Sequence, residues 1–139
     1  MNAISFYRIE RWLYLHNLII FAKIIRGVIF FLYNSFIPYS CLIGAGTTFG
    51  YKGMGVVIHS RAVIGKNCKI AQQVTIGGRS GIYEVPVIGD NVYLGAGCKV
   101  LGNVIIGNNV VVGANAVVIR SVPDNAVVAG VPAKIVKYV

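Results

Sequence analysis

A branched aliphatic residue recurs at every sixth position through the middle of the chain. The series covers eleven successive positions: Ile58, Ile64, Ile70, Ile76, Ile82, Ile88, Leu94, Val100, Ile106, Val112 and Val118. A period of six is neither the 3.6-residue period of an amphipathic helix nor the plain alternation of a half-buried strand. Short fixed periods of this kind are typical of solenoids, in which successive repeats stack on one another.

Small or compact apolar residues lie four positions after most of these aliphatics. They are Ala62, Cys68, Val74, Val92, Cys98, Val104, Val110, Ala116 and Val122. The double pattern predicts an all-β solenoid, a left-handed parallel β-helix, in which each hexad is one short strand and one corner and three hexads close a triangular coil. Both sets point inward, and the glycine that often follows the aliphatic accepts backbone angles that larger residues resist. One coil buries little alone, so stacking of at least about three repeats is needed for stability.

Two segments depart from the regular hexads. Phe49 and Ile58 are nine residues apart, so three extra residues fall within Tyr51–Gly55, and we expect them to bulge outward at a corner as a pocket wall. Ile82 keeps the six-residue register, but the glycines after Ile76 and the proline at position 86 predict a loop that leaves the coil.

The chain divides into three segments on this basis. Residues 1–37 form an N-terminal helical segment, residues 38–122 the β-helix, and residues 123–139 a C-terminal segment that covers the open end of the coil. Covering that edge limits strand-to-strand aggregation.

The N-terminal segment is apolar but carries basic residues. Ile4–Tyr33 predicts one or two helices, interrupted near Asn17 or Gly27. Lys23 and Arg26 would be costly at the centre of a bilayer, which argues against a spanning helix. Two roles stay open for residues 1–36: packing against the coil within an oligomer, or peripheral membrane contact with basic side chains towards the headgroups.

Composition narrows the classes of partner. Of the 139 residues, 56% are hydrophobic and only 12% charged, which suits a coil whose outer faces are buried in an oligomer. The net charge of +9 comes from scattered Lys and Arg without a nucleic-acid motif. It favours small phosphorylated ligands or an anionic membrane surface. No cleavable signal peptide is evident, so we expect a cytoplasmic protein, with the inner face of the membrane as a peripheral site.

The three cysteines, Cys41, Cys68 and Cys98, lack CxxC spacing. Two of them occupy the inward small-residue position of the repeat. We therefore interpret them as buried packing thiols of a reduced compartment, not as a disulfide or a metal site.

His59 is the strongest candidate for chemistry. It directly follows an inward aliphatic, where glycine is the commonest residue, and it comes just after the Tyr51–Gly55 insertion. A histidine of near-neutral pKa suits the removal of a proton from a hydroxyl. The alternative is a solvated corner histidine. His16, among apolar neighbours, is interpreted as structural, and one candidate histidine does not supply the ligand set of a zinc site.

Four segments taken together resemble the hexapeptide-repeat acyltransferases, and above all the serine acetyltransferase branch and the related sugar O-acetyltransferases of polysaccharide clusters. They are Ile58–Gly78, Ile88–Gly97, Val100–Asn103 and Ala129–Lys134. The likeness covers about residues 43–135, and the helical segment is far shorter than that of true serine acetyltransferases.

This resemblance implies a homotrimer with active sites between subunits and acetyl-CoA along the edge of the coil. A histidine would activate the acceptor hydroxyl for attack on the thioester, and backbone amides would stabilise the oxyanion. The positions that match the cofactor-binding loop and tail are Gly77, Gly78, Arg79, Gly81, Ala129, Gly130, Pro132, Ala133 and Lys134. Arg79 and Lys134 would meet phosphates.

The chain also departs from the serine branch. The catalytic histidine of that branch falls near Tyr51 or Lys52, and its second histidine, before the loop proline, is replaced by Val85. His59 is then the only histidine left on the coil.

The resemblance matches fewer positions for binding the acceptor than for binding the cofactor. Tyr51, Lys52 and Glu84 are the candidates for acceptor binding, and Glu84 or Asp90 for orienting the base, although Asp90 also fits a turn position.

Three functions remain. The preferred prediction is an acetyl-CoA-dependent O-acetyltransferase that modifies a sugar or glycan precursor in polysaccharide biosynthesis, without a metal. Serine O-acetylation and a non-catalytic trimeric scaffold are the alternatives.

Overall fold

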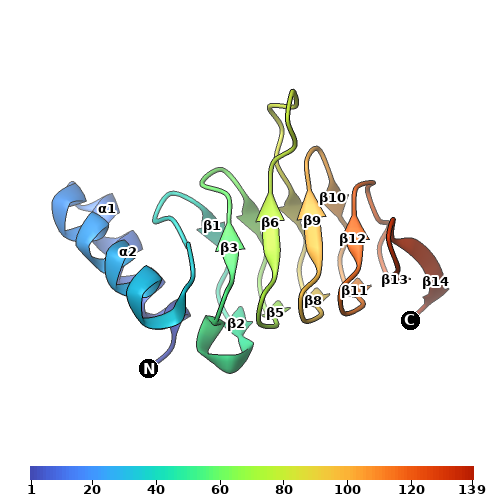
Figure 1. Ribbon diagram of the computed structural model, residues 1–139, viewed down its shortest axis with the longest axis horizontal. Coiled ribbons are helices and arrows are strands. Elements are labelled where there is room, and N and C mark those ends of the chain that lie inside the picture. The colour runs from blue at the N-terminus through green and yellow to red at the C-terminus, as the bar shows by residue number, and fades with distance from the viewer.

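A three-sided coil of short strands extends from a pair of N-terminal helices in the computed structural model, which describes residues 1–139 (Figure 1). The first side, the β1 sheet, holds β1 (Leu42–Ile43), β4 (Val63–Ile64), β7 (Val87–Ile88) and β10 (Ile105–Ile106). The second, the β2 sheet, holds β2 (Thr48–Phe49), β5 (Lys69–Ile70), β8 (Tyr93–Leu94), β11 (Val111–Val112), β13 (Ala126–Ala129) and β14 (Lys134–Tyr138). The third, the β3 sheet, holds β3 (Val57–Ile58), β6 (Thr75–Gly77), β9 (Lys99–Leu101) and β12 (Val117–Val118).

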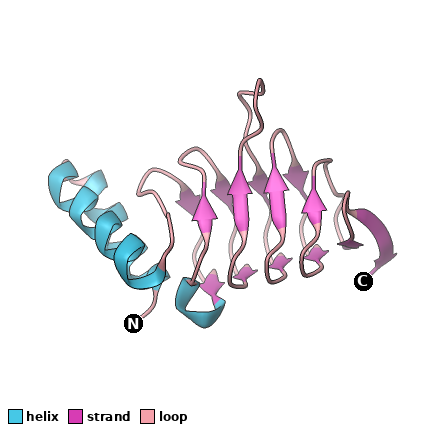
Figure 2. Cartoon of the chain, viewed as in Figure 1, coloured by secondary structure: helices cyan, strands magenta, loops and turns pink.

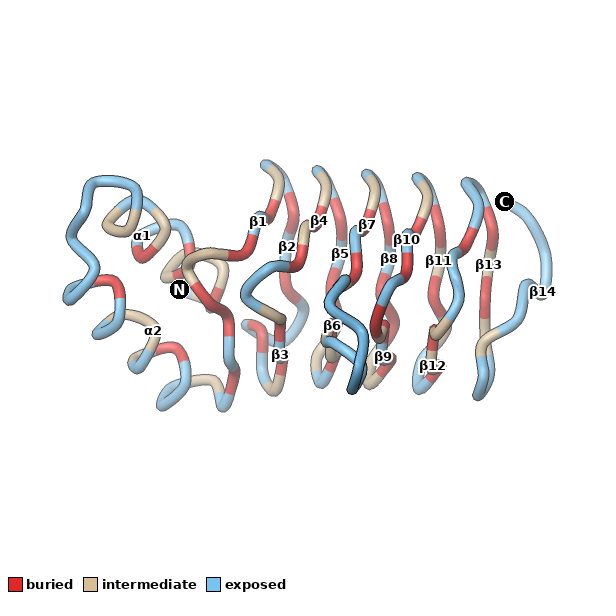
Figure 3. Tube along the Cα trace, turned by 90° about the horizontal axis from the view of Figure 1, so that it is seen from above, coloured by how far each residue is buried: buried red, intermediate tan, exposed pale blue.

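The predicted left-handed parallel β-helix is confirmed by this arrangement. Within the coil each strand pairs in parallel with the strand one turn away, so that like positions stack: Ile58 on Ile76, Ile76 on Val100, Val100 on Val118. These aliphatics and the compact residues four positions later are buried along the whole axis (Figure 3). Burial of each large aliphatic contributes about 1.5–3 kcal/mol, so the stacked interior is the main source of stability.

Two of the three corners repeat with a left-handed backbone. Between the β1 and β2 sheets this conformation falls on Gly46 and then on asparagines: Asn67, Asn91, Asn109 and Asn125. Between the β2 and β3 sheets it falls on Gly55, Gln73, Gly97 and Asn115. Glycine and asparagine tolerate positive φ better than other residues, so these corners can turn sharply at one residue. The third corner, from the β3 sheet to the β1 sheet, has no such column.

The loop predicted from the glycines and Pro86 does leave the coil, and Ile82 leaves with it, although its register had placed it among the inward aliphatics. Twelve residues separate Ile76 in β6 from Ile88 in β7, and Ile82 lies between them outside any strand, 37% exposed. The loop that projects above the third corner adds six residues, one whole hexad (Figures 1 and 2). The period therefore survives in the sequence even though the chain leaves the coil there.

The other departure is an outward bulge, as predicted. The extra residues form a 3₁₀ turn, Gly50–Gly53, in which Tyr51 and Lys52 have left-handed backbones and Tyr51 is 75% exposed. At the C-terminus the coil continues past residue 122. Val122 pairs with Ile106, and β13 adds a strand to the β2 sheet within the segment expected only to cap it. β14 then folds back antiparallel to β13 and covers its edge.

Two helices, α1 (Ala3–Leu15) and α2 (Ile19–Tyr33), lie against the first turn of the coil (Figure 1). They part at Asn17, whose backbone is left-handed, whereas Gly27 lies inside α2. Arg8 donates to the carbonyl of Ile43 at 2.6 Å, and Arg11 to that of Tyr39 at 3.0 Å. These two arginines therefore bind the coil and not lipid headgroups.

The outer face of α2 remains apolar and exposed, with Ile20 and Phe31 at 74% and 86%. Neither helix is long and apolar enough to cross a bilayer. Peripheral membrane contact of residues 1–36 stays a prediction.

Glu10 of α1 is a buried carboxyl without a hydrogen-bond partner. It is 0% exposed, and neither carboxyl oxygen is bonded. Burial raises the pKa of Glu10 to about 8, and the Arg26 guanidinium opposes this effect. The carboxyl is thus mainly protonated at neutral pH.

We expect Glu10→Gln to stabilise the protein at alkaline pH. Because the pKa of Glu10 is raised in the folded state, its contribution to stability is complete below about pH 4.5 and is lost as the pH rises through about 8. The loss is on the order of a few kcal/mol, at about 1.4 kcal/mol per pKa unit. Thermal unfolding at pH 9 should show a higher Tm for Glu10→Gln by several degrees, with the difference vanishing near pH 4. Glu84→Gln, on an exposed loop, is the control. A lower Tm of Glu10→Gln at pH 9 would contradict the expectation.

Candidate functional site

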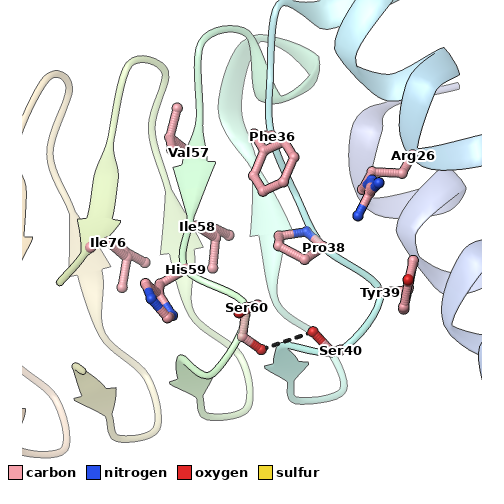
Figure 4. Close-up of a pocket in the computed structure, with 11 residues that line it drawn as sticks. Arg26, Phe36, Pro38, Tyr39, Ser40, Val57, Ile58, His59, Ser60 and Ile76 are labelled. Carbon is pink, nitrogen blue, oxygen red and sulfur yellow. Dashed lines mark hydrogen bonds between the residues drawn. The ribbon is translucent and has the colours of Figure 1, made fainter. Parts of the chain in front are cut away.

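His59 lies at the end of β3, on the irregular third corner. Its backbone N–H donates to the carbonyl of Ile76 at 2.8 Å, which places it one rung from the strand that leads into the loop. It lines a pocket of about 540 Å³ between the helices and the coil (Figure 4). The other lining residues are Arg26, Phe36, Pro38, Tyr39, Ser40, Val57, Ile58, Ser60, Ile76 and Gly77.

The imidazole of His59 is oriented by the backbone. The N–H of Arg61 donates to Nδ1 at 3.1 Å, so the neutral ring carries its proton on Nε2 in this arrangement. Burial, and then the nearby positive charge of Arg61, lower the pKa of His59 below its ordinary value of 6.5. The group that orients the ring is thus a backbone amide, not Glu84 or Asp90.

The base of the loop closes over the ring of His59. A Cβ placed on Gly78 would lie 3.8 Å from Cδ2 of His59 and 3.9 Å from Cγ1 of Val85. Arg61 holds the far arm of the loop, because its guanidinium donates to the carbonyl of Tyr83 and lies 4.0 Å from the centre of that ring.

Small residues and backbone form an edge that leads from His59 along the coil axis. Gly77 is in register with Leu101, and the N–H of Gly102 donates to the carbonyl of Gly77 at 2.9 Å. Beyond β12 the tail occupies the next rung, because the N–H of Val117 donates to the carbonyl of Gly130 at 3.0 Å. Four rungs separate His59 from the tail, which is about 19 Å at the usual strand spacing. We call this row the corner edge.

The predicted cofactor-binding residues lie at two points of the corner edge. Gly77, Gly78, Arg79 and Gly81 are at β6 and in the loop, and Ala129, Gly130, Pro132, Ala133 and Lys134 are in the tail beside β12. Arg79 lies across Gly102, where a Cβ would meet its Cδ at 2.6 Å; Gly102 also has a φ of +84°. Only glycine fits this position while the arginine keeps its place.

Positive charge prevails on this side of the molecule. Of the four acidic residues, Glu10 is buried, and Asp90 and Asp124 accept hydrogen bonds from the backbone N–H groups of Lys66 and Asn108 at the opposite corner. Asp90 is thus a turn residue. Glu84 is the acid left near the corner edge, on the exposed loop.

Tyr51 and Lys52 do not meet His59 within one chain. They project from the corner between the β2 and β3 sheets, beside Phe31, Met54 and Gln73. Glu84 lines a separate hollow with Arg61, Tyr83 and Asn103. The acceptor residues expected from the sequence therefore lie in two places, and neither place is the pocket of His59.

The three cysteines are buried packing thiols, as predicted. Burial raises the pKa of Cys41 and of Cys98 to about 12 and also raises that of Cys68. No group of three or more His, Cys, Asp or Glu side chains is arranged to hold a metal ion.

Arg26 belongs to the His59 pocket, and the sequence pattern did not indicate it. It comes from α2, whose packing on the coil the hexads do not describe. The one signal in the sequence was an arginine placed in the middle of an apolar run.

Known proteins match this chain in sequence and in structure. A family model described as "Bacterial transferase hexapeptide (six repeats)" matches residues 86–120. A serine acetyltransferase of Synechococcus elongatus is 38% identical over 97% of this chain and 56% of its own length. One from Staphylococcus aureus is 46% identical over 61% of this chain and 41% of its own length.

A solved serine acetyltransferase from Brucella abortus, in complex with coenzyme A, superposes with a TM-score of 0.92 at 33% identity, covering 98% of this chain and 55% of that one. The chain thus spans about half the length of the relatives it matches. The chain is therefore a member of the hexapeptide-repeat transferase family, on its serine acetyltransferase-like branch.

Proposed function

We propose that the protein is an acetyl-CoA-dependent O-acetyltransferase. The observation that carries the proposal is a histidine that lines a pocket at one end of a basic edge about 19 Å long, where burial and Arg61 lower its pKa. An extended cofactor with phosphates at one end and a thioester at the other suits such an edge. The relative solved in complex with coenzyme A supports this choice of co-substrate.

The comparisons favour serine over a sugar as the acceptor. The relatives reported above are all named serine acetyltransferases, and none of these names supports the sugar or glycan acceptor preferred from the sequence. The replacements of the histidines of that branch at Tyr51 and Val85 favour a sugar, but neither residue lines the pocket of His59. The role in polysaccharide biosynthesis is accordingly dropped.

His59 is the general base in this proposal. It takes the proton of the acceptor hydroxyl, the oxygen attacks the thioester carbon, and the carbon–sulfur bond breaks as the ring returns the proton to the thiolate of coenzyme A. For Nε2 to accept a proton, the ring must first carry its own proton on Nδ1, and the bond from the Arg61 N–H is given up. That bond is worth about 0.5–1.5 kcal/mol, a small part of a catalytic barrier.

A homotrimer is the assembly we propose. Tyr51 and Lys52 lie on one corner and His59 on another, so a threefold arrangement of coils would let one subunit's Tyr51 face its neighbour's His59 pocket. The exposed apolar residues of the outer faces, such as Val57 and Tyr93, support burial between coils. A cytoplasmic location stays a prediction.

Substitution of His59 separates its two conceivable roles. His59→Ala is expected to lower kcat by about 10²–10⁴-fold in an assay of thiol release from acetyl-CoA with L-serine. His59→Gln keeps a hydrogen-bond donor but no base, so it should be as slow as alanine if the ring removes the proton. Nearly full activity of His59→Gln would show that His59 acts only as a hydrogen-bond donor and not as the base. Unchanged activity of both variants would exclude His59 from the mechanism, and binding of coenzyme A without turnover in the wild type would favour the scaffold.

The pH dependence of kcat/KM should report the lowered pKa of His59. The base form accumulates as the pH rises, so activity should climb with pH and level off, with an inflection below 6.5. Arg61→Gln removes the positive charge and should move the inflection upward, whereas Arg61→Lys keeps the charge and should move it less. A wild-type inflection at or above 6.5 assigned to His59 would contradict this electrostatic account.

Arg61 should also keep the loop in place for the cofactor. In Arg61→Ala the stacking on Tyr83 and the bond to its carbonyl are lost, so amide hydrogen exchange across residues 79–85 should become faster and the KM for acetyl-CoA should rise by about 3- to 10-fold. Lys66→Ala, an exposed basic residue on the next corner, is the control. Unchanged exchange in Arg61→Ala would show that the loop is held by other contacts.

A further inference from the structure

Arg26 projects from α2 into the pocket of His59. Its Cζ lies 5.6 Å from the ring centre of Phe36 and 5.5 Å from that of Tyr39. The two rings belong to the strand-like segment that precedes the coil, in which Phe36 pairs with Val57 of β3. Figure 4 shows the guanidinium on the far side of Pro38 from the imidazole. Arginine and histidine thus face the same hollow from opposite ends.

The guanidinium of Arg26 has no hydrogen-bond acceptor in the chain. Its neighbours Arg8 and Arg11 donate to backbone carbonyls of the first coil, but Arg26 makes only the two ring contacts. The carboxyl nearest in electrostatic effect is Glu10, which forms no ion pair with it and whose raised pKa keeps it mainly neutral at pH 7. A half-buried cation therefore retains its charge and its donors.

The rest of the pocket offers no negative side chain. Besides Arg26 and His59, its polar side-chain groups are the hydroxyls of Tyr39, Ser40 and Ser60, and Ser40 already donates to the carbonyl of Ser60 at 3.0 Å. A ligand that brings its own negative charge would pair with Arg26 without competition from within the pocket. Guanidinium binds carboxylate with two parallel hydrogen bonds, and cation–π contacts with Phe36 and Tyr39 restrict where this guanidinium lies.

The cofactor and the acceptor would approach His59 from opposite directions. The corner edge runs from His59 away from the helices, towards Gly102 and the tail. Arg26 lies on the opposite side, beyond Phe36. Phosphates of a cofactor that follows the corner edge cannot reach it, so the anion that meets Arg26 belongs to the acceptor.

We propose that Arg26, held by cation–π contacts with Phe36 and Tyr39, binds the carboxylate of the acceptor and thereby places the acceptor's hydroxyl at His59. The acceptor is then a small hydroxy acid or hydroxy amino acid, of which serine is one. This inference rests on the proposed acetyl transfer and names the feature by which the enzyme selects its acceptor.

The test compares a carboxylate acceptor with its amide. Wild type, Arg26→Gln and Lys23→Gln are assayed with L-serine and with L-serinamide, which keeps the hydroxyl and the ammonium group but lacks the negative charge. Arg26→Gln should raise the KM for L-serine by about 10- to 100-fold and change that for L-serinamide by less than about 2-fold. Lys23→Gln removes a positive charge from the same helix outside the pocket and should change neither. Equal losses with both acceptors, or none, would overturn the proposal, as would a wild type that prefers the amide.

Calorimetric titration separates this inference from the proposed activity. L-Serine is titrated into wild type and Arg26→Gln in the presence of coenzyme A, and coenzyme A is titrated alone into both. If no acceptor is acetylated, the proposed activity fails, but binding of L-serine that is lost in Arg26→Gln would still support the carboxylate site. Absence of L-serine binding in the wild type would overturn it. A loss of coenzyme A binding in Arg26→Gln would also overturn it, because the role of Arg26 would then be structural.

Discussion

The inward stacking of one branched aliphatic on the next is the interaction on which the whole molecule depends. Strands of two or three residues cannot hold a sheet together by their own hydrogen bonds, since each pairs over so short a length. The column formed by Ile58, Ile76, Val100 and Val118 supplies the missing cohesion on one side, and equivalent columns supply it on the other two. The compact residues near the corners are required because the interior of a triangular coil narrows there.

A packed interior of this kind leaves chemistry only to the corners. Two corners turn on a left-handed residue in every coil, which is asparagine or glycine except at Gln73. They are occupied by backbone bonds such as that from the N–H of Asn91 to the carbonyl of Lys66 at 2.9 Å. The third corner lacks that regularity. There the chain can carry a histidine in place of glycine, and after Gly77 it can carry the long loop between β6 and β7. The same freedom allows Gly102 to receive the side chain of Arg79. The pocket of His59 and the corner edge therefore lie at the same corner, the one that does not repeat a left-handed residue in every coil.

The helical pair gives the site its remaining wall. Tyr7 donates to the carbonyl of Cys41 at 2.6 Å, and the arginines of α1 bind the next carbonyls, so the first open rung of the coil is satisfied by side chains instead of a further strand. This docking carries α2 to the mouth of the pocket and with it Arg26. The burial of Glu10 is a cost of the same contact, because its carboxyl lies where the helices close on the coil. Stability at that junction and the charge presented to a ligand are therefore linked.

The hexad pattern by itself determined the fold, since a residue that faces inward at each sixth position fits only a three-sided coil of parallel strands. It also determined the buried cysteines, the bulge at Tyr51 and the candidacy of His59, because each is a departure or a fit within a regular count. Two other features of the structure could not be predicted by counting positions in the sequence. An inserted loop of one whole hexad leaves the period intact, so Ile82 resembled a core residue although it is exposed.

Arg26, Phe36 and Pro38 join His59 only because α2 packs across the first coil, and that contact depends on side chains distant in sequence. The separation of Tyr51 and Lys52 from His59 has another cause, because they lie on a different corner of the coil. Which corner a residue occupies follows from the number of sides the chain has turned, and which corners meet is decided by packing in three dimensions.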